Sequence, residues 1–384
     1  MTACWPTAPL GALVACLDAR RVPLNRARRA RRPGPVPYYG ASGIIGHVEE
    51  ALFDGLLVLL GEDSAPFLDP MRDVAFFHDG PLWAGNHVHV LRPRPHVDGR
   101  FLAHALNTLD YAPYVEGTTR PKLVRARMND LPVPCPPLDQ QRKIGDALDQ
   151  ALRRIDRQLG ELVHQAGLEQ EREEAEILHA LSAARADGSV RPLGATFSIT
   201  GGGTPSTSRP EYWGRDVAWI TPADLPAGPP AWVSHGARGL SFTGLAACRA
   251  TLVAAGALVI STRAPVGRVG MGAGPLAVSQ GCKVLVPRGQ DVDLCYAAFA
   301  LHAAGPELRR RAGGSVFPEV DTATLASLEI CLPPLHTQRA VAQGITELLA
   351  QLREQDRARD RLASALREYR VAIRRTGMDG YLPA

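Results

Sequence analysis

Only a few residues of this chain have types and spacings that could support metal or cofactor chemistry. His87 and His89 are two positions apart, so on a strand both imidazoles would face one side and could share a metal ion. No carboxylate or cysteine near them in the sequence completes such a site. Gly270, Gly272 and Gly274 form a GxGxG pattern, but no helical pattern follows, which disfavours dinucleotide binding. We therefore expect no metal and no cofactor in this chain.

The sequence lacks the motifs of enzymes that act on DNA. An adenine methyltransferase would carry an [ND]-P-P-[YF] tetrapeptide that holds the flipped base. A DNA motor would carry a G-x-x-x-x-G-K-[ST] loop that binds phosphates, and this chain contains no Gly-Lys pair at all. The G-x-S-x-G motif of hydrolases is also absent. We expect no catalytic residues, and a DNA methyltransferase or nuclease is the less favoured interpretation.

Other side chains have the types that contact DNA. Seven arginines lie between residues 20 and 32, and the planar arginine fork suits phosphate and guanine. The glycine-rich loops 40–46 and 201–203 permit close backbone approach, and hydroxyls follow the second loop. A solvated charged segment, ordinary tight turns and a self-capped loop are the alternatives. The candidate DNA-binding residues are Arg26, Arg28, Arg29, Arg31, Tyr39, Ser42, Arg120, Lys122, Thr204, Ser206, Thr207, Ser208, Arg263 and Arg268.

An internal repeat organises the chain around these residues. The segment at 131–144 reads LPVPCPPLDQQRKI and that at 328–341 reads LEICLPPLHTQRAV, so the pattern PPL..QR recurs 197 positions later. The string PLGA at 9–12 recurs at 192–195, 183 positions later. Constant borders around divergent middles predict two related globular bodies, each followed by a polar stretch.

Both polar stretches are expected to be helical. Neither 139–182 nor 336–375 contains a proline, and apolar residues recur in both at spacings of three and four. This pattern is typical of a coiled-coil seam, and each helix of about 40 residues would be roughly 60 Å long. The other copy is the obvious partner for each apolar stripe, although a generic dimerisation coiled coil is an alternative. The Glu-rich run after Gly167 is either a solvated face or a contact for other subunits.

The two bodies have the pattern of mixed α/β (α+β) domains. Short strands are expected at 56–60, 88–91, 257–261 and 283–286, and short helices at 101–109 and 294–303. The predicted segments are a first domain at 1–138, a first long helix at 139–185, a second domain at 186–335, a second long helix at 336–376 and a C-terminal tail at 377–384.

Composition indicates a cytoplasmic protein. The seven cysteines are scattered without a CxxC pair, which favours free thiols in a reducing compartment. The N-terminus lacks a basic segment followed by an apolar stretch, so no signal peptide is expected. The longest apolar run, at about 250–260, is too short to cross a bilayer. The net charge of +4 is compatible with a nucleic-acid partner without indicating one.

Four longer strings resemble one known family. They read YYGASGIIGHVEEALFDGLLVLLGEDS (38–64), GGTPSTSRPEYWGRDVAWITPADL (202–225), STRAPVGRVGM (261–271) and AVSQGCKVL (277–285). They are similar to the target recognition domains of specificity subunits in type I restriction–modification systems. The likeness is collinear and covers nearly the whole chain. Two departures are the dense arginine segment and the GED at 61–63, where many relatives have an acidic pair or Asp-Gly.

The resemblance implies a non-catalytic DNA-binding subunit. Each target recognition domain would read one half of an asymmetric bipartite site in double-stranded DNA. The two helices would pair as an antiparallel coiled coil that sets the spacing. Two modification subunits, which use S-adenosylmethionine to methylate adenine, would be partners, and restriction subunits using ATP and Mg would join them. The alternatives are a specificity subunit of a related phage-defence methylation complex and a coiled-coil scaffold that binds only protein.

Overall fold

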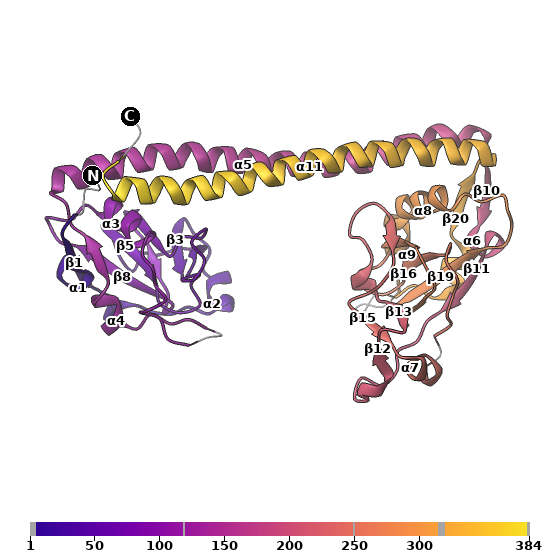
Figure 1. Cartoon of the computed structure of the whole chain (residues 1–384), viewed down its shortest axis with the longest axis horizontal. Helices are drawn as coiled ribbons and strands as arrows, with labels where there is room; N and C mark the ends of the chain where they lie inside the picture. Colours follow the sequence, from indigo (N-terminus) through magenta and orange to yellow (C-terminus); the bar gives the residue numbers. More distant parts are fainter. Residues whose placement is uncertain (1–4, 118–119, 249, 314–318, 382–384) are drawn as a thin grey trace. The chain divides into compact units, whose positions relative to one another are not determined.

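The computed structural model describes residues 5–117, 120–248, 250–313 and 319–381. The chain forms two compact units, and each unit combines a globular body with part of both long helices (Figure 1). Unit 1 consists of Met1–His164 and Ala358–Ala384, and unit 2 consists of Gln165–Arg357. Residues 1–4 of the predicted first domain and 382–384 of the predicted tail lie outside the described residues.

The body of unit 1 contains three β-sheets, with strand orders β2-β8-β5-β6, β4-β3-β7 and β1-β9. All neighbours pair antiparallel except β3 and β7. The strands are β1 (Thr7–Pro9), β2 (Val14–Cys16), β3 (Val36–Gly40), β4 (Gly43–Val48), β5 (Leu56–Gly61), β6 (Ala75–Asp79), β7 (Trp83–Ala84), β8 (Val88–Pro93) and β9 (Pro132–Pro134). The helices are α1 (Leu10–Leu13), the 3-10 helix η1 (Asp18–Arg20), α2 (Arg26–Ala30), α3 (Gly99–Leu106) and α4 (Arg125–Asn129).

The central strand β5 separates two apolar clusters. Successive side chains of a strand point to opposite faces, so Val58 and Leu60 join the cluster beneath α3, whereas Leu57 and Leu59 join the cluster on the other face. Burial on both sides explains why this strand reads as a continuous apolar run. The predicted strands at 56–60 and 88–91 and the predicted helix at 101–109 are confirmed as β5, β8 and α3.

The body of unit 2 also contains three sheets, of orders β11-β19-β16-β17-β14, β12-β15-β13-β18 and β10-β20, and the first two are each one strand larger than those of unit 1. The strands are β10 (Ser189–Pro192), β11 (Phe197–Gly201), β12 (Trp213–Gly214), β13 (Val217–Ile220), β14 (Ala231–Val233), β15 (Arg238–Leu240), β16 (Leu258–Ser261), β17 (Val269–Gly272), β18 (Leu276–Val278), β19 (Cys282–Pro287) and β20 (Glu329–Leu332). The helices are η2 (Ala184–Asp187), α6 (Leu193–Thr196), η3 (Pro210–Tyr212), η4 (Pro222–Asp224), α7 (Phe242–Ala247), α8 (Leu294–Ala303), α9 (Gly305–Arg311) and α10 (Thr322–Ser327). The predicted strands at 257–261 and 283–286 and the predicted helix at 294–303 are confirmed as β16, β19 and α8.

The repeated borders of the sequence form the same frame in each unit. The strand before each PLGA string pairs antiparallel with the strand before each proline pair, as β1 with β9 and β10 with β20. The glutamine that recurs in the PPL..QR pattern, Gln141 and Gln338, then stabilises this strand pair through hydrogen bonds. Gln141 accepts from the Asp98 amide and donates to the Pro136 carbonyl, each at 2.8 Å. Gln338 makes the same two bonds, to Asp293 and Pro333, at the same distances.

The long helices are α5 (Leu138–Ala183) and α11 (Leu335–Met378). In unit 1, Ile155 of α5 shares a core with Ile373 near the end of α11. In unit 2, Ile177 near the end of α5 shares a core with Ile345 near the start of α11. Within each unit the helices therefore run antiparallel, as predicted.

A histidine on the body of each unit bonds an acid on α5. His104 of α3 lies 2.8 Å from Asp149, and His302 of α8 lies 2.9 Å from Glu174. Burial would raise the pKa of Asp149, but the hydrogen bond and charge of His104 outweigh it and hold that pKa below its usual value. These bonds orient each body on the helix pair.

The predicted seam of α11 is only partly correct in its last third. Leu366 and Ile373, which the apolar spacing places in the seam, pack in the core of unit 1. Leu362 and Tyr369, which the same spacing places there, are half exposed, and the half-buried Arg370 takes the place of Tyr369 in the packed row. This difference arises because this part of α11 packs against the body of unit 1 as well as against α5, and Arg370 binds Asp73 of that body.

Candidate nucleic-acid interface

Helix α2 and its C-cap residue Arg31 carry the free arginines of the dense segment in unit 1, which are called the arginines of α2 below. Asn25 caps the helix by accepting a hydrogen bond from the Arg28 amide at 2.8 Å. Arg26, Arg28 and Arg31 are exposed, and within the described part of the chain their side chains make no hydrogen bond or ion pair. Their charges are therefore available to an anionic partner.

The remaining arginines of this segment have partners inside the unit. Arg29 donates to the Leu24 carbonyl at 2.8 Å and lies over the Tyr38 ring. Arg32 binds Glu49 and Glu50 at 2.6 and 2.7 Å. These bonds position the segment and use up donors that phosphate would need, so Arg29 is a weaker candidate than the sequence indicated.

The two other candidates of this region, Tyr39 in β3 and Ser42 in the turn after it, differ in exposure. Tyr39 is only 5% exposed, its hydroxyl lies 3.2 Å from His78 Nδ1, and burial raises the pKa of that hydroxyl. The structure therefore favours a core role for Tyr39 over direct contact with a ligand. Ser42 is exposed in the turn. Gly43, with φ of +102°, supplies the backbone conformation that this turn needs.

Two further cations of unit 1 lie beside the loop that follows β5. Arg120 is exposed, and the described residues offer its side chain no hydrogen-bonding or ionic partner. Lys122 lies 3.4 Å from Glu62, whose carboxylate also binds Arg21 at 2.6 Å. Lys122 is therefore partly neutralised, and Arg120 is the freer charge.

Two tryptophan side chains hold the hydroxyl-rich loop of unit 2 (residues 203–208) in place through hydrogen bonds. Trp219 donates its indole N–H to the Gly203 carbonyl at 3.0 Å, and Trp213 donates to the Ser206 carbonyl at 3.2 Å. A side chain at Gly202 would meet the Val278 carbonyl oxygen at 2.0 Å, so the glycine there is explained by packing. The loop hydroxyls are partly committed, because Thr204 donates to Gln280 and Ser206 pairs with Ser208 at 2.8 Å. Thr207 remains exposed.

The two other arginine candidates of unit 2 are engaged. Arg263 binds Glu319 at 3.1 Å, and Arg268 donates to the Leu225 carbonyl at 3.2 Å. Two arginines that sequence reasoning missed, Arg215 and Arg238, are exposed instead, and no described residue hydrogen-bonds or ion-pairs with their side chains. Both line a hollow in which no acidic residue takes part.

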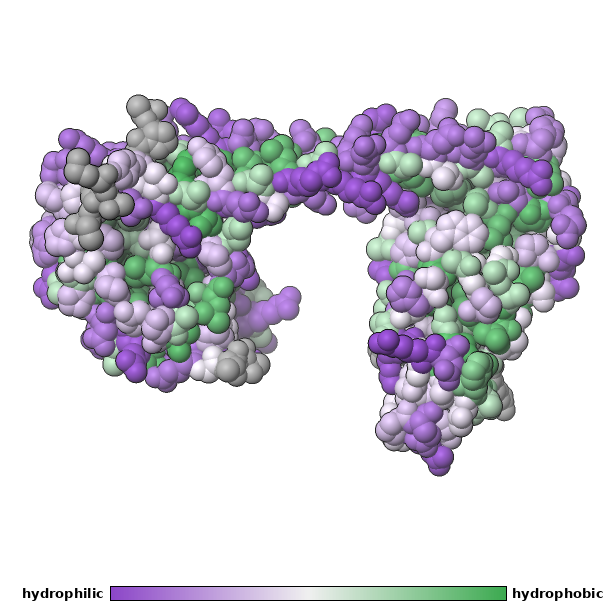
Figure 2. Space-filling model, in the orientation of Figure 1, coloured by the Kyte–Doolittle hydropathy of each residue, from purple (hydrophilic) through white to green (hydrophobic). Residues whose placement is uncertain are grey.

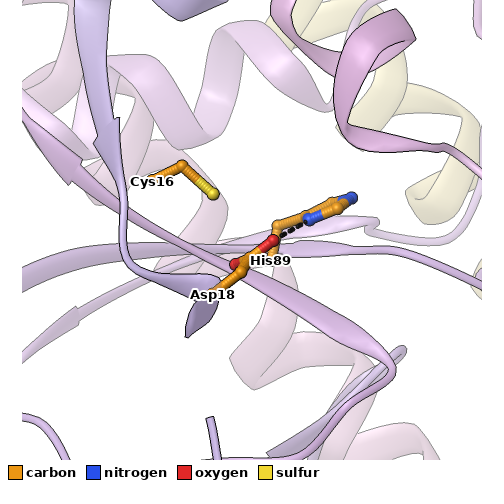
Figure 3. Close-up of side chains that lie close together, drawn as sticks. All are labelled: Cys16, Asp18 and His89. Carbon is orange, nitrogen blue, oxygen red and sulfur yellow. Dashed lines mark hydrogen bonds and ion pairs between the residues drawn. The ribbon is translucent and has the colours of Figure 1, made fainter. Parts of the chain in front are cut away.

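The two histidines that suggested a metal site each contact a different carboxylate. His87 is exposed and lies 2.5 Å from Asp63, whereas His89 is buried and lies 2.6 Å from Asp18. Figure 3 shows His89 and Asp18 facing each other with Cys16 beside them.

This cluster of Cys16, Asp18 and His89 is satisfied by its own hydrogen bonds. The second nitrogen of His89 lies 2.9 Å from the Leu123 carbonyl, and Asp18 also accepts from the Val90 amide at 2.9 Å. Burial chiefly raises the pKa of the Cys16 thiol, and the neutral thiol is a poor metal ligand. We interpret the cluster as a structural network that ties η1 to β8.

Comparison with known proteins agrees with this architecture. The family model of the type I restriction modification DNA specificity domain matches twice, at residues 14–164 and 187–359. The MjaIX type I restriction enzyme specificity subunit of Methanocaldococcus jannaschii is 30% identical over 184 residues, which cover 47% of this chain and 43% of that protein. The S.HindORF215P specificity subunit of Haemophilus influenzae is 34% identical over 141 residues, which cover 37% and 36%. The matched parts thus span less than half the length of these relatives.

A solved structure shows the same fold over the whole chain. It comes from work on complex assembly and conformational transition of the type I R-M system, and its matching chain has a TM-score of 0.68 at 18% identity, with 97% of both chains covered. None of the described helices has a stretch long and apolar enough to span a membrane. Because the family model matches the greater part of the sequence in two copies, this chain belongs to the type I restriction modification DNA specificity family.

Proposed function

We propose that this chain is the DNA specificity subunit of a type I restriction–modification complex and does no chemistry itself. The observation that carries the proposal is the duplicated frame. Both units close their body with the same strand pair and the same buried glutamine, yet they present different surfaces. Unit 1 offers the arginines of α2, and unit 2 offers a hydroxyl loop beside Trp213. Two different readers on one frame suit an asymmetric site in two halves.

The long helices are proposed to set the spacing of the half-sites and to dock two modification subunits. The face of these helices that Figure 2 shows is mainly hydrophilic. The modification subunits would supply S-adenosylmethionine for adenine methylation, and restriction subunits would supply ATP- and Mg-dependent cleavage.

Methylome sequencing tests this function directly. Cells that carry the chain are expected to show methylated adenines in one bipartite motif, and deletion of the chain is expected to abolish that motif. The purified chain alone is expected to turn over no S-adenosylmethionine. Methylation that persists without the chain, or turnover by the chain alone, would contradict the proposal.

The free arginines of α2 give a second test. Replacing Arg26, Arg28 and Arg31 by alanine is expected to weaken DNA binding by the full chain and to reduce the slope of log K against log salt by about 1 per lost phosphate contact. The preferred sequence is expected to stay the same, because phosphate contacts carry no base information. Binding titrations between about 50 and 200 mM salt measure the slope.

A control variant separates local contacts from net charge. Replacing the exposed arginines Arg353, Arg357 and Arg361 of α11 removes the same number of charges away from the bodies. It is expected to change the slope less. An equal change in both variants would assign the arginines of α2 to a solvated surface.

A further inference from the structure

A stack of three side chains fixes one arginine at the surface of unit 2. The guanidinium carbon of Arg238 lies 3.3 Å from the centroid of the Trp213 ring. Trp213 in turn packs edge-on against Trp219, with centroids 5.2 Å apart and planes at 76°. Both indole N–H groups donate to loop carbonyls, at Ser206 and Gly203. Because both rings are held in place, the plane of the Arg238 guanidinium is held as well.

The backbone beneath this stack is a rigid sheet. Arg238 begins β15, which lies between β12 and β13, and it is the register partner of Trp219. Trp213 of β12 pairs with Leu240 of the same strand. Figure 1 shows this sheet at the end of unit 2 remote from α11. A side chain on paired strands is held more accurately than one on a loop.

The donors of Arg238 are left unused by unit 2. The side chain is exposed, and across the described residues it forms no hydrogen bond and no ion pair. Arg209, which also lies over an aromatic ring, instead donates to the Tyr212 hydroxyl at 3.1 Å and lies 3.9 Å from Glu211. Arg238 thus differs from Arg209, because the guanidinium of Arg238 is oriented by a ring and its N–H groups are free of hydrogen bonds among the described residues.

The hollow beside Arg238 suits a ligand that presents acceptors. It has a volume of about 670 Å³ and is lined by Trp213, Arg215, Ser234, His235 and Arg238 among others, with no carboxylate in its wall. A planar arginine fork matches two acceptors that lie side by side, and guanine offers this pair, O6 and N7, in the major groove.

We infer that Arg238 is a specificity-determining residue, which reads one guanine of the half-site bound by unit 2. The inference rests on the proposed function and adds to it one residue and one base. Phosphate is the competing acceptor. The fixed plane favours the base, because a fork whose plane is set by Trp213 donates only to acceptors in that plane. The exposed Arg215, which lines the same hollow, has no such ring beneath it and can follow a phosphate freely.

The test compares the target motifs of three full-length variants in the native host. With Arg238→Ala or Arg238→Lys, the methylome is expected to relax at one G·C position in one half of the motif and to keep the other half. Lysine is expected to fail because it lacks the fork. Arg209→Ala is the matched control, and its motif is expected to equal the wild-type motif. The unfolding temperatures of the three variants are expected to be alike, because Arg238 and Arg209 are both at the surface.

Binding of the purified complex to defined duplexes identifies the atoms. Replacing the assigned guanine by 7-deazaguanine, which lacks N7 but keeps O6, is expected to weaken wild-type binding about 5- to 30-fold, the lower half of the range for a bidentate base contact, because one of its two hydrogen bonds is lost. The same replacement is expected to leave binding by the Arg238→Ala complex unchanged, since the contact is already lost.

Each other outcome overturns the inference in a recognisable way. An unchanged motif with uniformly weaker, less salt-dependent binding would make Arg238 a phosphate contact. An unchanged motif with unchanged binding would make it a surface residue only. If the wild-type complex itself selects no sequence, the proposed function fails. If it selects one and the Arg238→Ala complex selects the same one, only this inference fails.

Discussion

Replacing Asp73 by asparagine is expected to destabilise unit 1 by about 3 kcal/mol, at the lower end of the range for breaking a buried pair. Asp73 accepts from Arg370 at 3.0 and 2.6 Å and from Arg374, whose second bond is 2.9 Å long. The Arg374 side chain is 6% exposed. Without the carboxylate, the buried Arg374 guanidinium keeps its desolvation cost and loses its counter-charge, whereas the half-buried Arg370 keeps an ion pair with Asp156 at 3.2 Å. Because Asp73 and Arg370 are each 18% exposed, water offsets part of the loss.

The effect is expected to depend on pH. Burial would raise the pKa of Asp73, but the hydrogen bonds and charges of Arg374 and Arg370 outweigh it and hold that pKa below its usual value. A lowered pKa stabilises the folded state fully above the unfolded-state value of about 3.9, and this stabilisation is lost as the pH falls through the folded-state value. The difference between wild type and Asp73→Asn is therefore expected to be constant near neutral pH and to shrink below about pH 4.

Urea unfolding and hydrogen exchange measure this prediction. The Asp73→Asn variant is expected to lose amide protection in the last part of α11, which carries both arginines. Glu50→Gln is the control, since Glu50 binds Arg32 at the surface and its loss is expected to change stability by at most about 0.5 kcal/mol. Equal stability of Asp73→Asn and wild type would show that the carboxylate does not hold α11 on the body.

Local patterns accounted for most of the fold. The long helices follow from proline-free stretches with apolar spacings of three and four, and these are properties of consecutive residues. The seam failed at Leu362 and Tyr369, because a heptad pattern describes a helix that packs on another helix only. Near these residues, α11 also packs on the body of unit 1, and the hydrogen bonds to Asp73 hold Arg370 in the packed row. A pair separated by 297 positions leaves no local signal.

The candidate interface was less predictable for the same reason. Sequence reasoning found the hydroxyl loop and the free arginines of α2 because both are compact runs. It missed Arg238, because Trp213 and Arg238 are 25 positions apart and meet only through the pairing of β12 with β15. It placed Tyr39 at the interface, although β3 is buried on both faces there. Sequence alone does not show whether a strand in a glycine-rich region has one covered face or two.

The largest functional effect is expected from shortening both long helices together. Deleting residues 163–169 of α5 and 355–361 of α11 removes one heptad from each, so the seven-residue repeat on either side stays in register. These segments lie between the core residues of the two units, since Leu159 and Leu366 pack in unit 1 and Ile177 and Leu349 pack in unit 2. Both bodies are therefore expected to keep their own cores.

The removed helix corresponds to a defined length of DNA. Seven residues rise by roughly 10 Å in an α-helix, and B-DNA rises by about 3.4 Å per base pair, so the loss equals about three base pairs. Three base pairs also turn the duplex by roughly 100°, and the helix pair compensates for only part of that rotation. The new target is therefore expected to keep both half-sequences, to lose about two to four base pairs between them, and to be bound more weakly than the original.

Methylome sequencing of cells with the shortened chain reads the spacer directly. Deleting one heptad from α5 alone puts the helices out of step and serves as the control, for which little or no methylation is expected. A chain that loses both heptads and still methylates the original motif at full level would show that the helices do not set the distance. A shorter spacer with both half-sequences intact would establish them as the element that does, because neither body has been altered.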